Sequence, residues 1–416
     1  MTLFAKRHRA GANERIFVQV AAYRDPELVP TLRDCLAQAD HPALLTFGIC
    51  WQHAEGDSLE EFANHPNLRL RQVPYRESRG ACWARSETQA LYGGETYTLQ
   101  IDSHHRFSRG WDSSLKALFI EAVQRGSRKP LITSYAPAYD PAGDERSRGT
   151  QPLRLVFHEF SEQGPVQVMP EAMPGTLGSS RLEPARFLSA HFLFTLGSFC
   201  TQVPYDPKLY FFGEEPGMAI RAFTHGYDLF HPKEPLLWHY YGRDTERRHW
   251  GDNTQWWLRH QRSLLRYQRL IAAGGESQTL EDYGLGTQRT LRQYERYAGL
   301  SLAARKVSAH TLKGLPPPQP WLDRWSARPL LPERVIDVPL RDLPPGFGEL
   351  ASDRLAISAL NRRGREVAQR QLTGDAMRDA VGKGCYRLRL YSADPPSAWR
   401  VVPWREAKGW CHATTG

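Results

Sequence analysis

The stretch YTLQIDSHHRFSRGWD, from Tyr97 to Asp112, begins as an apolar strand and ends in a cluster of polar residues. On a β-strand, residues two apart project to the same side. If the strand runs to Asp102, then Asp102 and His104 emerge together at its carboxyl end, where α/β sheets present their ligand sites. A carboxylate and an imidazole suit Mn²⁺ and tolerate Mg²⁺ or Zn²⁺, although such a pair can equally form a capped turn.

A third candidate ligand lies at the end of another apolar run. In PLLWHYYGR, residues 235–243, the apolar residues end at His239, so a polar group again lies at a strand edge. A histidine in such a place is more often a core or surface residue. Its value as a ligand comes from pairing with Asp102 and His104, which together with His239 would make a three-residue metal site.

Strand and helix patterns alternate around this stretch. Apolar strands are predicted at residues 16–21 and 44–51, with a helix between them on which Leu32, Cys35 and Leu36 recur at helical spacing. Further strands and helices are predicted at residues 68–75, 80–93, 96–102, 111–126, 130–137, 255–271 and 287–300. This alternation predicts the α/β fold class, with a sheet flanked by helices.

Two later segments break the alternation. Residues 141–184 are rich in Gly, Pro and Ser, and we expect a loop-rich insertion that faces the substrate. The run GLPPPQPW begins a stiff linker at 314–324, and the short strand-like runs beyond it predict a small β-rich accessory domain at 325–416. The first domain is then expected at 1–313.

Composition excludes several classes of protein. With 416 residues, 41% of them hydrophobic, the chain can bury a full core. No run reaches the roughly 20 apolar residues that span a bilayer, and the basic start lacks a signal-peptide stretch, so we expect no membrane span and a cytoplasmic protein. The cysteines are scattered without C-x-x-C spacing, which favours reduced structural thiols.

The net charge of +9 raises the question of nucleic-acid binding. The arginines are spread along the whole chain and no nucleic-acid motif is present, so we expect no nucleic-acid partner. A solvated basic surface is the favoured interpretation, with an anionic small substrate next. The oligomeric state is not encoded in these patterns.

Arginines and acidic residues supply two further site candidates. In YRESRGACWARSE, residues 75–87, Arg79 and Arg85 lie near the start of a predicted helix, where phosphates bind well, and beside a metal they would help to neutralise a diphosphate. In FFGEEPG, Glu214 and Glu215 follow a run of aromatic residues. They either begin a helix, where the helix dipole favours acidic residues, or line a sugar-facing wall with one carboxylate at the reacting centre.

Three segments in this order resemble a known family. IFVQVAAYRDPEL (16–28), ACWARSETQALYGGETYTLQIDSHHRFSRGWD (81–112) and FFGEEPGMAIRAFTHGYDLFHPKEPLLWHYYGR (211–243) resemble the GlcNAc-transferase family that includes the hydroxyproline GlcNAc-transferase of a ubiquitin-ligase adaptor. The likeness covers roughly residues 15–300. It implies a GT-A glycosyltransferase, a nucleotide-sugar-binding sheet similar in its motifs to the polypeptide GalNAc-transferases.

The resemblance also implies roles for individual residues. Asp102 and His104 match a metal-binding D-x-H motif, with His239 as the third ligand. The other matches are to a loop and a region that contact the nucleotide, namely Tyr23, Arg24, Asp25, Arg79 and Arg85. Glu214 and Glu215 match the catalytic acidic pair near donor sugar and acceptor. His105, a second histidine after the motif, departs from the family pattern and could compete as a ligand.

The implied reaction is the metal-dependent transfer of GlcNAc from UDP-GlcNAc, with retention of anomeric configuration, to a hydroxyl of a protein or glycan. The metal expected is Mn²⁺, with Mg²⁺ as the alternative. Two other functions stay open: a non-catalytic protein with a GT-A-like body that binds a nucleotide or a glycan, and a metal-dependent hydrolase. The hydrolase would need a water-activating base near the metal, and no H-E-x-x-H motif is present.

Overall fold

The computed structural model describes residues 14–174, 180–242, 248–272, 277–322 and 325–416, which form two compact units. The first unit takes in the described residues as far as Ala303 and also His310–Ala327. The second consists of Ala304–Ala309 and Arg328–Gly416. Among the described helices, none is both long enough and apolar enough to cross a bilayer.

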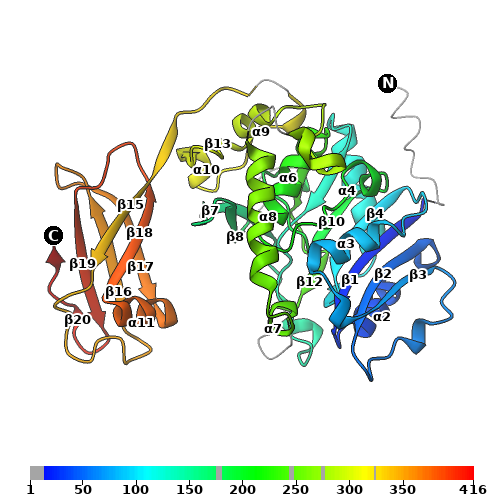
Figure 1. Cartoon of the computed structure of the whole chain (residues 1–416), viewed down its shortest axis with the longest axis horizontal. Helices are drawn as coiled ribbons and strands as arrows, with labels where there is room; N and C mark the ends of the chain where they lie inside the picture. The colour runs from blue at the N-terminus through cyan, green and yellow to red at the C-terminus, as the bar shows by residue number, and fades with distance from the viewer. Residues whose placement is uncertain (1–13, 175–179, 243–247, 273–276, 323–324) are drawn as a thin grey trace. The chain divides into compact units, whose positions relative to one another are not determined.

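An eight-stranded mixed sheet forms the centre of the first unit, in the order β3-β2-β1-β4-β10-β6-β11-β9. Figure 1 labels five of these strands, β3, β2, β1, β4 and β10. The strands from β3 to β4 run parallel, and β10 lies antiparallel between β4 and β6. The bounds are β1 (Ile16–Tyr23), β2 (Leu45–His53), β3 (Leu68–Pro74), β4 (Tyr97–Asp102), β6 (Pro130–Thr133), β9 (Leu182–Pro184), β10 (Phe192–Leu196) and β11 (Asp228–Pro232). The predicted α/β sheet is thereby confirmed, and β4 lies at its centre.

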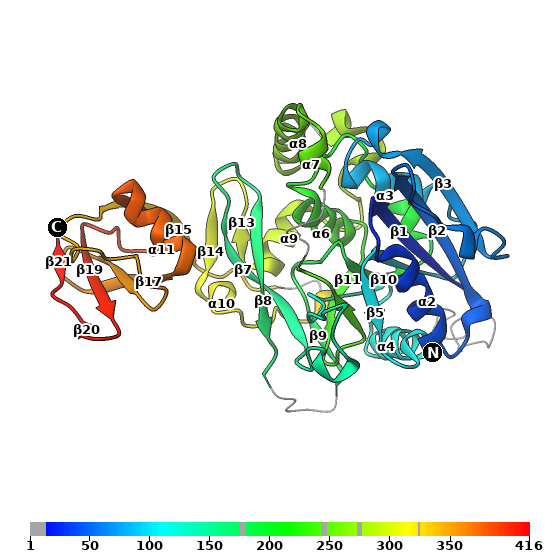
Figure 2. The ribbon, with the colours of Figure 1, turned by 90° about the horizontal axis from the view of Figure 1, so that it is seen from below.

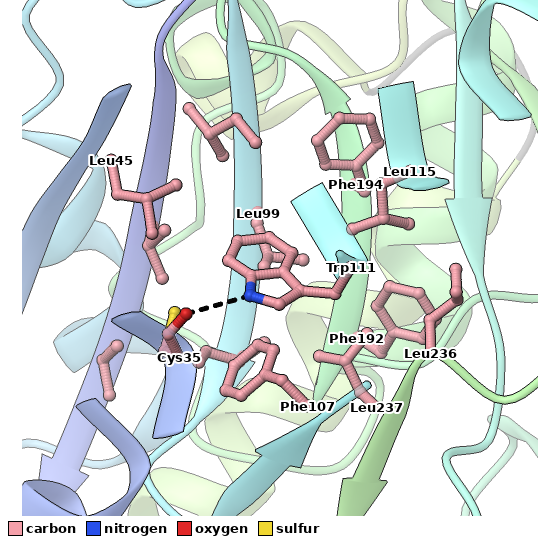
Figure 3. Close-up of a cluster of buried hydrophobic side chains, with 14 of the residues drawn as sticks. Cys35, Leu45, Leu99, Phe107, Trp111, Leu115, Phe192, Phe194, Leu236 and Leu237 are labelled. Atoms are coloured by element: carbon pink, nitrogen blue, oxygen red, sulfur yellow. Dashed lines mark hydrogen bonds between the residues drawn. The ribbon is translucent and has the colours of Figure 1, made fainter. Parts of the chain in front are cut away.

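Helices cover both faces of this sheet. On one face, α2 (Leu28–Gln38) and α4 (Trp111–Gln124) pack on alternate residues of β1 and β4. Figure 3 shows Trp111 in this cluster, with its Nε1 donating to the Cys35 carbonyl at 2.9 Å. The other face carries α3 (Ala81–Gln89), α5 (Phe199–Gln202) and α6 (Glu214–Thr224).

Two small sheets flank the central one. Strand β5 (His105–Phe107) pairs antiparallel with β12 (Leu237–His239). Strands β7 (Leu153–Phe160) and β8 (Val166–Ala172) form a hairpin inside the segment expected to be loop-rich (Figure 2). The expectation of a loop-rich segment is wrong for these two strands, because the Gly, Pro and Ser residues at either end of the segment obscured the strand pattern within it.

The remaining elements of the first unit are the longer helix α8, several short helices and the two-residue strand β13. They are α7 (His249–Asp252), α8 (Trp256–Ile271), α9 (Leu291–Ala298), β13 (Leu300–Ser301) and the 3-10 helices Pro42–Leu44, Glu60–Phe62, Tyr75–Glu77, Glu145–Ser147, Ser277–Tyr283 and Pro320–Leu322. Helix α10 (Ala309–Leu312) lies at the boundary between the units.

The second unit is rich in β-structure. It contains β14 (Lys306–Ser308), β15 (Leu330–Pro339), β16 (Arg354–Leu360), β17 (Glu366–Thr373), α11 (Gly374–Lys383), β18 (Cys385–Tyr391), β19 (Ala398–Arg405), β20 (Gly409–Trp410) and β21 (Thr414–Thr415). Strands β14, β15 and β18 make one sheet, and β17, β16, β19 and β20 make another with β21 beside β19. Apolar residues of both sheets and of α11 form its core.

The proline-rich segment belongs to the first unit. Within it, Trp321 packs against Phe230 with ring centroids 5.9 Å apart, and Pro320 is buried. Residues 304–309, predicted to be in the first domain, group instead with the second unit through the pairing of β14 with β15. The division of the chain into independently folding domains at residues 313 and 325 stays a prediction.

Candidate functional site

Strand alternation decides where Asp102 points. In β4, Leu99 and Ile101 join the core beneath α2 and α4. Residues two apart share a face, so Gln100 and Asp102 project to the opposite side, which α3 and α6 cover. The carboxylate therefore emerges at the end of the central strand, next to the first turn of α6 and the middle of α3.

Asp102, His104 and His239 offer atoms that could hold a metal ion, and these atoms all lie within 4.8 Å of one another. The Nε2 atoms of His104 and His239 are 3.0 Å apart, and Asp102 Oδ2 lies 3.4 Å from His239 Nε2 and 3.9 Å from His104 Nε2. Adjacent ligands on a metal with bonds of about 2.1 Å lie about 3.0 Å apart. The three side chains thus fit one face of a divalent-metal site.

Pairing of β5 with β12 brings His239 to this place. His105 lies directly opposite His239 in that pair, and His104 immediately precedes His105. The backbone of Tyr240 also donates to the carbonyl of His104 at 3.1 Å. A local two-stranded sheet, rather than the central one, therefore joins the two predicted histidines.

Asp25 supports the metal-capable histidine. Its Oδ2 lies 2.8 Å from Nδ1 of His104, and the hydroxyl of Ser103 donates to the same oxygen. The Asp25 side chain is fully buried. A carboxylate on the second ring nitrogen fixes the tautomer, so that Nε2 carries the lone pair with which a histidine binds a metal. Sequence reasoning matched Asp25 to a loop that contacts the nucleotide, and the structure places it behind His104 instead.

His105 lies beside the three metal-capable side chains, with its ring centroid 4.9 Å from that of His239. It is fully buried, its Nδ1 lies 3.2 Å from the carbonyl of Asp102, and its backbone N–H donates to Thr31 Oγ1 at 2.9 Å. Burial lowers the pKa of the His105 ring well below its usual value. A neutral ring that donates through Nδ1 leaves only a lone pair at Nε2, which has no hydrogen-bond partner among the described residues. Among the described residues, the group whose atoms lie close enough to share one ion consists of Asp102, His104 and His239 and does not include His105.

Arg85, on α3, joins two acidic residues of the site. Its Nη2 donates to Asp102 Oδ1 at 2.6 Å and its Nη1 donates to Glu214. Only 7% of Arg85 is exposed. Although burial opposes it, the charge of Arg85 holds the pKa of Asp102 well below the usual carboxyl value. The guanidinium that was expected to contact phosphate is thus already committed to two carboxylates.

The two adjacent glutamates have different surroundings. Gly213, at φ +90°, begins α6, and an added Cβ there would lie 3.1 Å from Tyr267. Glu214 is buried against Arg85. Glu215 is partly buried, and burial raises the pKa of its carboxyl to about 7. The acidic pair begins a helix, as the simpler interpretation predicted, and only Glu215 keeps a carboxylate without an arginine partner that the structure describes.

Two cavities meet at this site. The first, called the β1 cavity because Tyr23 at the end of β1 lines it, has a volume of about 350 Å³. The second, called the β8 cavity because residues 166–168 of β8 line it, has a volume of about 370 Å³. Both are lined by Arg85, Asp102, Phe211 and His239. The β1 cavity also includes Tyr23, Gln52, Ser78, His104, His249 and Trp250. The β8 cavity adds Glu214, Glu215, His191, Phe212, His158 and residues Val166–Val168. The site therefore consists of two adjoining cavities, with Asp102 and His239 in the wall of both and His104 in the wall of the β1 cavity.

The other predicted nucleotide contacts lie around the β1 cavity. Tyr23 lines it, and its hydroxyl donates to Asp252 Oδ2 at 2.9 Å. Arg24 also binds Asp252, at 2.8 Å, and stacks on the Tyr75 ring. Arg79 is exposed, lies over the ring of Trp83 and is not among the described residues that line the two cavities. Of these predicted residues, only Tyr23 and Arg85 reach the cavity.

Several residues of the site were missed in the sequence. His249 and Trp250, on α7, line the β1 cavity, and His249 contacts Tyr210 Oη at 2.7 Å and the Ser78 carbonyl at 3.1 Å. His191 lines the β8 cavity from just before β10. A histidine within an apolar stretch carries no local signal for a site, and α7 is only four residues long. Only the tertiary arrangement identifies them.

Comparison with known proteins agrees with the fold. The family model described as Glycosyltransferase (GlcNAc) matches residues 15–64 and 58–304, well over half of the chain. No curated protein matches the sequence. A crystal structure of GalNAc-T7 with UDP, GalNAc and Mn²⁺ is similar at a TM-score of 0.51 and 12% identity, covering 96% of this chain and 69% of that one.

A lower similarity is found to S. aureus TarS 1-349, at a TM-score of 0.39 and 13% identity, covering 65% of this chain and 70% of that one. The fold comparison therefore depends on the GalNAc-T7 structure, whose low identity supports the shared architecture alone. The family model agrees with the resemblance seen in the sequence.

Proposed function

Because the chain belongs to the GlcNAc glycosyltransferase family, we propose that it transfers GlcNAc from UDP-GlcNAc to a hydroxyl of a protein or glycan acceptor, with a divalent metal and retention of configuration. The observation that carries the proposal is the group Asp102, His104 and His239 at the meeting point of two cavities. Retention is taken from the family resemblance. A transferase needs one space for its nucleotide and another for its acceptor, which the two cavities provide.

The ligand set fits Mn²⁺ or Mg²⁺. Two imidazoles and one carboxylate suit Mn²⁺ better than Mg²⁺, which prefers oxygen ligands. The cation held by these residues would supply positive charge to the donor diphosphate. Asp25 orients His104 for this task, and Arg85 holds Asp102 ionised. The chain's own residues thereby keep a carboxylate and two imidazoles ready to bind.

The β1 cavity is the proposed place of the nucleotide. It opens beyond the carboxyl end of β1, where nucleotides bind in α/β sheets. Aromatic rings of Tyr23, His249 and Trp250 line it and could stack on a base. Arg248 is also in the lining and adds a positive charge within reach of a phosphate.

The β8 cavity is then the proposed place of the acceptor, and Glu215 is the carboxylate that would orient a hydroxyl there. Glu214 is taken up by Arg85, whereas Glu215 lines the cavity and titrates near neutral pH, at a pKa of about 7. A carboxylate with such a pKa can accept a hydrogen bond from a hydroxyl group at physiological pH. Exposed rings of Phe211 and Phe212 border the same cavity.

We expect the full-length protein to release UDP from UDP-GlcNAc when Mn²⁺ is present, and EDTA to stop the release. UDP-GalNAc, UDP-glucose and UDP-galactose serve as donor controls, and proton NMR of the GlcNAc product reports its anomeric configuration. Mass spectrometry of a cell extract labelled with the preferred donor would identify the acceptor. Tight binding of UDP-GlcNAc without any release of UDP would make the chain a binding protein and contradict the proposal.

The carboxyl of Glu215 should lower stability at alkaline pH. Its pKa is raised to about 7 by burial from an ordinary value of 4.5, so the folded chain binds more protons than the unfolded chain between these pH values. Stability contributed by this group therefore falls as pH rises through that window. Glu215→Gln should raise the free energy of unfolding at pH 8 by on the order of 2 kcal/mol, and by much less at pH 4.5.

Urea denaturation at the two pH values measures this difference. Glu214→Gln is the matched control on the neighbouring position. Because it removes one carboxylate from Arg85, it should destabilise the fold at pH 8 rather than stabilise it. Equal effects of the two substitutions would show that the surroundings do not distinguish the glutamates.

A further inference from the structure

The carboxylate of Glu215 is held by a buried segment that precedes β10. Its Oε1 accepts hydrogen bonds from the backbone N–H of Ala190 at 2.9 Å and from the hydroxyl of Ser189 at 3.2 Å. The hydroxyl of Ser189 lies 2.7 Å from Nδ1 of His191, whose Nε2 lies 3.0 Å from the backbone N–H of Ala136. These contacts link the start of α6, the segment before β10 and the loop that follows β6.

The direction of each hydrogen bond in this chain can be deduced. A backbone N–H only donates, so Nε2 of His191 must accept from Ala136. In a neutral ring the proton is then on Nδ1, which donates to the oxygen of Ser189. The Ser189 hydroxyl keeps its own hydrogen for Glu215. The neighbours of each group therefore decide whether it donates or accepts each hydrogen bond.

His191 is not available for other tasks. Its ring lies 4.6 Å from the ring of His239, measured between centroids, but both of its nitrogens are already engaged. It is only 8% exposed, and Ser189 is fully buried. Burial of a histidine and a serine costs free energy unless they are hydrogen-bonded, and here both are. The pair therefore belongs to an ordered arrangement that ends on the carboxylate.

We propose that Ser189 and His191 are positioning residues that fix the Glu215 carboxylate at the wall of the β8 cavity. Two donors on Oε1 restrict rotation of the carboxylate, so that Oε2 keeps one direction for an acceptor hydroxyl. This inference builds on the proposed function, because only a transferase or hydrolase would need that carboxylate oriented. Ser189 does not line the β8 cavity and acts through Glu215, and His191, which does line it, acts on Glu215 through Ser189.

The first test needs no activity. In crystal structures of the full-length protein, Ser189→Ala should leave Ala190 as the single donor to Oε1, and the Glu215 carboxylate should rotate or adopt more than one conformation. His191→Phe keeps the ring but removes both nitrogens, and it should have the same effect. An unchanged, single conformation of Glu215 in both variants would overturn the proposal, whatever the enzyme assay shows.

The second test measures the release of UDP from UDP-GlcNAc with Mn²⁺. Ser189→Ala should lower kcat about 10-fold, the equivalent of one hydrogen bond to a charged group, and leave the affinity for UDP with Mn²⁺ unchanged. His191→Asn retains a donor near the position of Nδ1 and should keep most of the activity that His191→Phe loses. A fall in UDP affinity equal to the fall in kcat would indicate a general structural defect and count against the proposal.

A double-mutant cycle separates positioning from packing. In a Glu215→Gln background, which already lacks the charged carboxylate, Ser189→Ala should lower the remaining kcat by less than 2-fold. A purely structural role would instead give the same 10-fold loss in both backgrounds and would overturn the proposal. If the wild-type chain releases no UDP at all, the proposed function fails, while the crystal structures still decide the role of Ser189 and His191.

Discussion

Asp102→Ala is expected to abolish Mn²⁺-dependent binding of UDP and to lower the release of UDP from UDP-GlcNAc by more than about 10³-fold. Asp102 is the single carboxylate among the three metal-capable side chains. Without it, His104 and His239 would have to hold the cation alone, and the freed Nη2 of Arg85 would place a positive charge beside the same position. Loss of a ligand and loss of the negative charge that faces Arg85 both act against metal binding.

Isothermal titration of UDP with and without Mn²⁺, together with electron paramagnetic resonance of free Mn²⁺, measures this loss. Glu95→Gln is the matched control, because it removes a buried carboxylate that is paired with an arginine, Arg69, just before the start of β4. This control should bind UDP and Mn²⁺ as the wild type does. Full UDP binding by Asp102→Ala in the presence of Mn²⁺ would refute the assignment of the metal site.

The second large effect is expected on stability. Arg85→Met should lower the free energy of unfolding by about 3–5 kcal/mol, because it leaves the carboxylates of Glu214 and Asp102 without their buried cation. The methionine fills part of the same volume, so the change tests charge more than packing. Release of UDP should fall as well, since the pKa of Asp102 rises once Arg85 is gone, and a protonated carboxyl binds metal poorly.

Urea denaturation of three variants beside the wild type checks this prediction. Arg79→Met removes an exposed arginine six residues earlier in the chain and should change stability by less than about 0.5 kcal/mol. Arg85→Met combined with Glu214→Gln should recover part of the loss, because one of the two unpaired charges is then absent. Equal free energies of unfolding for Arg85→Met and Arg79→Met would contradict the prediction, because they would show that the ion pairs of Arg85 with Asp102 and Glu214 do not stabilise the fold.

Local patterns in the sequence were sufficient for the central part of the site. The apolar run that begins at Tyr97 predicted a strand, and the polar residues that follow it predicted a ligand site at its end. Asp102, His104 and His239 do lie together. Their metal-binding role stays a prediction, but the prediction that they could share one ion needed only strand ends and residue chemistry.

The surroundings of these three residues could not be predicted in the same way. The family resemblance grouped Asp25 with Tyr23 and Arg24, yet the chain turns between them, so that Asp25 contacts His104 and Arg24 contacts Asp252. Arg24 has a left-handed backbone, with φ of 48°, at this turn. A change of direction over one residue leaves no trace in hydrophobic periodicity.

The sequence by itself determined the alternation of strands and helices, the polar end of β4 and the family, because each depends on residues that are close together in the chain or on an ordered set of short motifs. The tertiary structure alone decided which side chains share a charge or a hydrogen bond. It pairs Arg85 with Glu214 and Asp102 and leaves Glu215 to Ser189. Two adjacent glutamates have the same local sequence, and only the elements packed around the start of α6 make one of them an ion-pair partner and the other a candidate for the reaction.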